Sequence, residues 1–175
     1  MACLGENFTD ALSKALLSAD FKIPSVGGSV LITVGGKELK KQIVPLAKQL
    51  SQMGFKIYAT QHTAEAIMDS GEKGVTVLHK VREAERKPNI ADYIREGKVD
   101  LVVNIPLISA PGEQENVLKD EYTIRRLAIE YNIPVLTNLE LASALVKIFR
   151  EEEDGCELTL RSLNEYMETL SLVKW

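Results

Sequence analysis

Thr60 and Thr63 lie three residues apart at the end of a short apolar run, in the segment Ala59-Thr60-Gln61-His62-Thr63. A strand is expected to pass into a helix here, so two hydroxyl groups lie beside the free N–H groups at the positive end of that helix. Such a set of donors suits a phosphate or a carboxylate. The alternative is that Thr63 only caps the helix, and the motif by itself does not separate the two interpretations.

Cationic and amide side chains follow the neighbouring predicted strands. Gly35-Gly36-Lys37 leads from the first strand into a helix that carries Lys40, and the third strand ends at His79-Lys80. Asn104 ends the fourth strand, before an expected loop that runs to Lys119 and includes Ser109, Pro111 and Gly112. Loops of that length in compact domains are usually functional or mobile. The structural alternatives are a solvated lysine and an asparagine that ties down the loop backbone.

A basic loop with Arg82, Arg86 and Lys87 follows the third predicted strand, and such loops are more often solvated than functional. The strand ends together supply hydroxyls, amides and cations, with only scattered carboxylates. Ligands of open parallel sheets bind at the carboxyl ends of the strands. The pattern therefore predicts an anion-binding pocket rather than an acid–base active site.

Short apolar runs alternate with stretches of helical periodicity, which is typical of a parallel α/β sheet. The predicted strands are Ser29–Val34, Lys56–Ala59, Val75–Leu78, Leu101–Asn104 and Pro134–Leu136. The predicted helices between and after them are Lys37–Met53, Thr63–Ser70, Asn89–Glu96, Asp120–Tyr131 and Asn138–Arg150. Since the strands are apolar on both faces, helices must cover both sides. We expect a three-layer α/β sandwich around a five-stranded parallel sheet.

The 175 residues, 45% of them hydrophobic, suffice for one domain and are too few for two ordinary ones. Residues 1–28 are expected to be a lead-in helix, over Asn7–Leu17, and a connector. The domain proper is expected over residues 29–150. Residues 151–175 are expected to hold an acidic break and a last helix, Leu160–Leu170.

Composition excludes several functional classes. The 21 basic and 25 acidic residues give a net charge of -4, so no overall field attracts nucleic acid or an anionic membrane. Cys3 and Cys156 are far apart and belong to no zinc-binding motif. No apolar run approaches the roughly 20 residues needed to cross a bilayer. We expect a cytoplasmic, metal-free chain with neither a nucleic-acid nor a membrane partner.

Several segments resemble, in the correct order, the C-terminal regulatory domain of the carbamoyl phosphate synthase large chain. They are Gly54–Ala64, Arg86–Ile90, Val99–Asn104, Tyr122–Arg126 and Ile133–Asn138. The first is similar to the family stretch GF-x-x-x-AT-x-x-TA. The resemblance implies the methylglyoxal synthase-like (Rossmann-like) fold. It extends into residues 1–24, which implies that Met1 is internal to a longer natural chain.

The resemblance also implies a function. It indicates a non-catalytic allosteric domain that binds a small anionic effector and regulates carbamoyl phosphate synthesis for the pyrimidine and arginine pathways. The implied partners are the upstream ATP-grasp domains of the same chain and a glutaminase subunit of the holoenzyme. ATP and magnesium are expected only in those upstream domains, so this domain is expected to hold no cofactor.

Two effector classes occur in the resembled family: nucleotides such as UMP, IMP and UTP, and N-acetylglutamate. The positions similar to the phosphate and ribose contacts of the nucleotide type are Lys40, Thr60, Thr63, Lys80 and Asn104. The positions similar to the acetylglutamate contacts hold His79, Leu107 and Glu121, which depart from that pattern. We expect a nucleotide effector, with N-acetylglutamate as the alternative.

Two further alternatives remain open. A methylglyoxal synthase-like lyase needs a carboxylate base beside its phosphate cradle. That family carries Gly-Gly-Asp after the third strand and a histidine after the first, where this chain has Arg82–Lys87 and Gly35–Lys37. Glu83 or Glu85 would have to substitute. The other alternative is a domain kept only for subunit contacts through its C-terminal helix, with an empty pocket.

Overall fold

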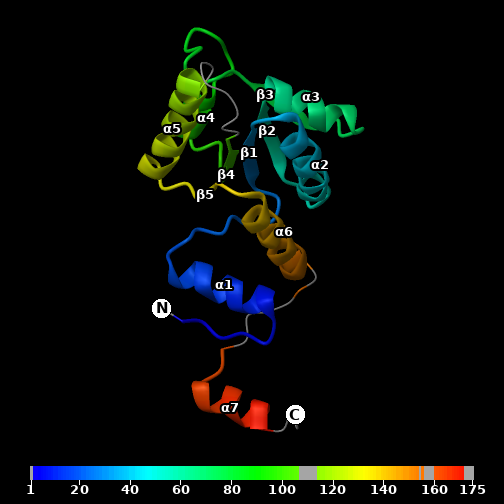
Figure 1. Ribbon diagram of the computed structural model, residues 1–175, viewed down its shortest axis with the longest axis vertical. Coiled ribbons are helices and arrows are strands. Elements are labelled where there is room, and N and C mark those ends of the chain that lie inside the picture. The colour runs from blue at the N-terminus through cyan, green and yellow to red at the C-terminus, as the bar shows by residue number, and fades with distance from the viewer. Residues whose placement is uncertain (1, 107–113, 154, 156–159, 172–175) are drawn as a thin grey trace.

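The computed structural model describes residues 2–106, 114–153, 155 and 160–171, and centres on a five-stranded parallel sheet (Figure 1). The strands are β1 (Ser29–Val34), β2 (Lys56–Thr60), β3 (Val75–Leu78), β4 (Leu101–Ile105) and β5 (Val135–Leu136). The helices are α1 (Phe8–Ser18), α2 (Lys37–Gln52), α3 (Gln61–Asp69), α4 (Ile90–Arg95), α5 (Gln114–Glu130), α6 (Leu139–Glu153) and α7 (Leu163–Ser171).

The strand order is β3-β2-β1-β4-β5, and each neighbouring pair is parallel. The chain starts in the middle of the sheet, moves outward through β2 to β3, and then returns to the other side of β1. Ile32 of β1 accordingly pairs with Ala59 on one side and with Val103 on the other. This reversal creates the switch point at which open α/β sheets bind ligands, beyond the carboxyl end of β1.

Helices cover both faces of the sheet, so β1 is buried along its whole length. Val30 and Ile32 pack into a core formed with α2, α3 and α6, and Leu31 packs into a second core formed with α4 and α5. Figure 1 shows α2 and α3 on one side of the sheet and α4 and α5 on the other. The predicted three-layer α/β sandwich is confirmed.

The terminal helices extend this core. Leu12 and Leu16 of α1 pack against the core that contains α6, and Figure 1 shows α1 beside α6. The ammonium group of Lys14 donates a 3.0 Å hydrogen bond to the hydroxyl of Tyr166 in α7. The proposed division into residues 1–28, 29–150 and 151–175 stays a prediction. Side chains from the first segment pack against the core of the second segment.

Several predicted boundaries are wrong, among them the start of the last helix, which is Leu163 rather than Leu160. Helix α5 begins at Gln114 rather than at Asp120, so the expected long loop is shorter, and its residues 107–113 lie outside the described residues. Helix α6 continues through Glu151–Glu153 into the predicted acidic break. Both extensions contain glutamate or glutamine, which are good helix formers. Helix α3 begins at Gln61, two residues before the predicted start, because β2 extends to Thr60.

Among the helices of the described residues, none has the length and apolar character needed to cross a membrane.

Candidate functional site

A cavity of about 360 Å³ opens at the carboxyl ends of β1, β2 and β3. Four of the five predicted site residues line it: Lys40, Thr60, Thr63 and Lys80. They come from α2, the end of β2, the first turn of α3 and the segment after β3. Separate parts of the chain therefore meet at the edge of the sheet where a ligand site was expected.

The two threonine hydroxyls form one short hydrogen-bonded chain. Thr60 Oγ1 donates to Thr63 Oγ1 over 3.3 Å, and Thr63 Oγ1 in turn lies 3.4 Å from the carbonyl oxygen of Val34 and 3.3 Å from its amide nitrogen. Thr63 is fully buried in the first turn of α3, and Thr60 is the N-cap residue. The alternative that Thr63 only caps the helix is therefore wrong. Its hydroxyl joins α3 to the end of β1, and the half-buried Thr60 lies on the cavity wall.

Two lysines supply positive charge to the cavity. Lys40 and Lys80 are both half-buried, and within the described part of the chain neither ammonium group forms a hydrogen bond or an ion pair. Two half-buried ammonium groups beside hydroxyls and a helix N-terminus attract an anion, because charge-assisted hydrogen bonds are about twice as strong as neutral ones.

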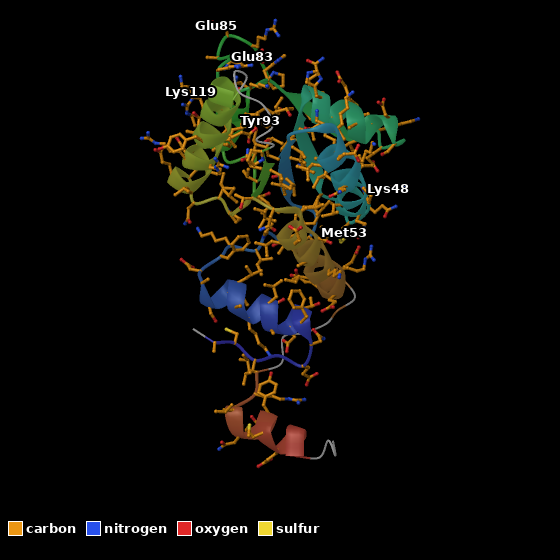
Figure 2. All side chains as sticks on the ribbon, in the orientation of Figure 1. Lys48, Met53, Glu83, Glu85, Tyr93 and Lys119 are labelled. Carbon is orange, nitrogen blue, oxygen red and sulfur yellow. The ribbon has the colours of Figure 1, made fainter. Side chains whose placement is uncertain are left out.

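The basic loop after β3 also reaches the cavity, where the sequence favoured a solvated loop. Arg82 and Arg86 both line the cavity wall. Arg82 Nε lies 3.4 Å from Asp120 Oδ2, and Arg86 Nη1 lies 3.7 Å from Glu83 Oε1. Figure 2 shows the side chain of Glu83 on this loop, at the end of the molecule away from Lys48. Each arginine thus has one carboxylate as its ion-pair partner.

Two carboxylates from α5, those of Asp120 and Glu121, complete the wall. The sequence pointed to Glu121 only as a departure at a position similar to the acetylglutamate contacts, and it did not point to Asp120. Asp120 is buried, and its Oδ2 forms the ion pair with Arg82 without a hydrogen bond among the described residues. Glu121 lines the cavity, and burial raises the pKa of its carboxyl group, while hydrogen bonds from Asn104 and Thr33 partly oppose that rise. One sequence signal could have located Glu121 in the site. It lies three and seven residues before the buried Ile124 and Ala128, a helical spacing that puts its carboxylate on the core-facing side of α5.

Asn104, the fifth predicted site residue, lies behind the cavity wall rather than on it. It is fully buried, and its Nδ2 donates to Thr33 Oγ1 over 2.9 Å and to Glu121 Oε2. Its Oδ1 accepts a 3.4 Å hydrogen bond from Arg125 Nη1. Both amide hydrogens and the amide oxygen are thus occupied within the protein, so Asn104 faces Glu121 and not the open cavity.

The cavity wall therefore has an anion-binding part and a part that accepts hydrogen bonds. One part offers hydroxyls, ammonium groups and helix N–H groups to an anion. Another part offers the Glu121 carboxylate, which accepts hydrogen bonds. In the described residues no group of three or more His, Cys, Asp and Glu side chains is arranged to hold a metal ion. Cys156 and the loop positions Leu107 and Ser109 lie outside the described residues.

Comparison with known proteins identifies the family of this chain. The model of the MGS-like domain family matches residues 42–137, which include α3, the loop after β3 and the two acidic residues of α5 that line the cavity, Asp120 and Glu121. The chain belongs to the MGS-like domain family. The match contains four of the five predicted site residues, since Lys40 lies two residues before its start.

The curated relatives of this MGS-like domain include carbamoyl phosphate synthase large chains. That of Clostridium botulinum is 36% identical over 152 residues, which cover 86% of this chain and 13% of the relative. That of Thermotoga maritima is 35% identical over 173 residues, which cover 93% of this chain and 15% of the relative. The multifunctional protein CAD of Squalus acanthias is 30% identical over 158 residues, which cover 86% of this chain and 7% of the relative. The resemblance to the carbamoyl phosphate synthase large chain is confirmed, and the chain spans under a sixth of the length of these relatives.

Proposed function

We propose that this MGS-like domain is the effector-binding regulatory domain of a carbamoyl phosphate synthase large chain, and that its cavity binds a nucleotide such as UMP, IMP or UTP. The domain itself performs no catalysis and needs no cofactor. Its partners are the upstream ATP-grasp domains of the same chain and a glutaminase subunit. Regulation of the pyrimidine or arginine pathway then follows from coupling between this cavity and the distant ATP-grasp sites.

One observation carries the proposal. The cavity brings together Lys40, Thr60, Thr63 and Lys80, and in the described part of the chain neither ammonium group forms a hydrogen bond or an ion pair. A nucleotide phosphate needs cations and hydroxyl donors together. The cavity volume of about 360 Å³ lies within the range of small-molecule sites, roughly 300 to 1,000 Å³.

N-acetylglutamate fits this cavity less well. It carries two carboxylates, and the wall contains the carboxylate of Glu121 in addition to those of Glu83 and Asp120, which pair with arginines. Like charges brought together in a partly buried site repel each other. A nucleotide has its charge at one end and neutral hydroxyl groups beyond it, which suits a cavity with cations on one part of its wall and carboxylates on another.

Calorimetric titration of the 175-residue chain with UMP, IMP, UTP and N-acetylglutamate tests the proposal. We expect saturable binding of at least one nucleotide at a stoichiometry of one, and no comparable binding of N-acetylglutamate. Binding of N-acetylglutamate alone would reassign the effector. Binding of none of the four would favour a domain that serves only subunit contacts.

The lyase alternative has one observation in its favour, because Glu83 and Glu121 line the same cavity as the two threonines. A carboxylate whose pKa is raised by burial is a candidate general base. Incubation with dihydroxyacetone phosphate, followed by a colorimetric assay for methylglyoxal, separates the two functions. We expect no methylglyoxal above the rate without protein, and sustained turnover would overturn the non-catalytic proposal.

A further inference from the structure

Glu121 is held in place on the cavity wall by two residues of the sheet. Thr33 Oγ1 of β1 donates to Glu121 Oε2 over 3.3 Å, and Asn104 Nδ2 of β4 donates to the same oxygen. Asn104 also donates to Thr33 over 2.9 Å, which closes a three-membered network. The two strands are neighbours in the sheet, where Thr33 pairs with Asn104. The carboxylate is therefore fixed in position before any ligand arrives.

The hydrogen bonds of this network leave one side of the carboxylate unused. Both donors bind Oε2, and among the described residues no donor binds Oε1. Glu121 lines the cavity, whereas Asn104 is fully buried behind it. A partly buried carboxylate is unfavourable unless its oxygens are hydrogen-bonded, so Oε1 is suited to accept a hydrogen bond from a group that enters the cavity.

We propose that Glu121 is a specificity-determining residue, whose Oε1 accepts a hydrogen bond from a ribose hydroxyl of the bound nucleotide, while Asn104 acts as its positioning residue. This inference rests on the proposed function. It replaces Asn104, whose amide is fully occupied, as the direct ribose contact expected from the sequence. Acidic side chains serve the same purpose in dinucleotide-binding folds, where a carboxylate accepts a hydrogen bond from a ribose hydroxyl.

The carboxylate would also select against other ligands. The fixed carboxylate of Glu121 only accepts hydrogen bonds. It favours binding of a ligand with a hydrogen-bond donor at this position, and it repels a ligand with a second negative charge there. A nucleotide places its phosphate at the lysines and threonines and its neutral hydroxyl groups next to Glu121. The network thus discriminates between a ribonucleotide and a dicarboxylate, although both are anions.

A double-mutant cycle between protein and ligand tests this inference. The wild-type chain and Glu121→Gln are each titrated with UMP and with 2′,3′-dideoxyuridine 5′-monophosphate. Glutamine keeps the shape and an acceptor for Thr33 and Asn104, but it removes the charge. We expect the wild type to prefer UMP by about tenfold or more, as for a hydrogen bond to a charged group, and the variant to lose most of this preference. Because both ligands carry the same phosphate, the general effect of the lost charge cancels.

Glu130→Gln is the matched control, since Glu130 lies on the same helix, pairs with Arg126 and is absent from the cavity wall. This control should keep the full preference for UMP. An equal preference in the wild type and Glu121→Gln overturns the inference while leaving the proposed function intact. If the variant does not fold, equal binding of the two ligands by the wild type overturns it as well. Failure of the wild type to bind any nucleotide overturns the proposed function and this inference together.

Discussion

The hydroxyl group of Thr60 donates a 3.3 Å hydrogen bond to the hydroxyl group of Thr63, although the two residues differ in exposure. Thr63 is fully buried and bonded to the backbone of Val34, whereas Thr60 is half-buried on the cavity wall. One threonine therefore serves the fold and the other is available to a ligand. A substitution at Thr63 should therefore lower the stability of the fold, and a substitution at Thr60 should lower the affinity for the ligand.

Thr63→Val should destabilise the chain. Valine fills the same space but leaves the amide and carbonyl groups of Val34 without the hydroxyl that now bonds both. We expect a loss of about 1 to 3 kcal/mol in the free energy of unfolding, the usual penalty for an unsatisfied buried polar group. Urea unfolding followed by circular dichroism measures it. A stability within error of wild type would mean that the Thr63 hydroxyl does not join α3 to β1.

Thr60→Ala and Lys80→Ala should weaken nucleotide binding while the fold is preserved. Each removes one polar side chain from the predicted phosphate contact, and the loss should be roughly 1 to 3 kcal/mol in the binding free energy for a charge-assisted contact. Calorimetric titration with UMP measures it, with unchanged circular dichroism as the folding check. Lys48→Ala is the matched control, because Lys48 is exposed on α2 away from the cavity (Figure 2). Wild-type affinity in both site variants would remove these residues from the site.

The stability of the chain should depend on pH through Glu121. Burial raises the pKa of this carboxyl group above its usual value of 4.5. The protonated form is therefore favoured in the folded chain, so its stabilising contribution is complete below 4.5 and is lost as pH rises through the raised folded pKa. Glu121→Gln cannot ionise. Its free energy of unfolding should increase relative to wild type as pH rises from below 4.5 to neutral.

Urea unfolding of both proteins at a series of pH values measures this difference. A difference that stays constant, or that shrinks towards neutral pH, would show that the Glu121 carboxyl group is not held in an environment that disfavours its charge.

Phe149→Ala should test whether α6 belongs to the core. Phe149 is fully buried, and its ring centroid lies 4.8 Å from that of Phe55. Truncation removes this contact and leaves a cavity, so we expect a loss of about 3 to 5 kcal/mol in the free energy of unfolding. Thermal and urea unfolding measure it. A loss below about 1 kcal/mol would contradict the packing of α6 against the sheet.

The sequence by itself determined the strands and the end of the sheet that carries the cavity. The bounds of β1 and β3 agree with the predicted ones, because apolar runs between turn residues specify buried parallel strands locally. The position of Thr60 and Lys80 directly after such strands then sufficed to place them at one edge. The clustering of four of the five predicted site residues in one cavity follows from that local information.

Only the tertiary structure decided which polar groups face the cavity. Asn104 was expected to form a hydrogen bond with the ligand. Its amide is instead hydrogen-bonded to Thr33, Glu121 and Arg125. Glu121 stood in the sequence only as a departure from the acetylglutamate pattern, and its contacts with Thr33 and Asn104 depend on how α5 packs on the sheet. Hydrogen-bond partners that are 17 to 88 residues apart depend on strand order and helix packing, which local propensity and periodicity do not specify.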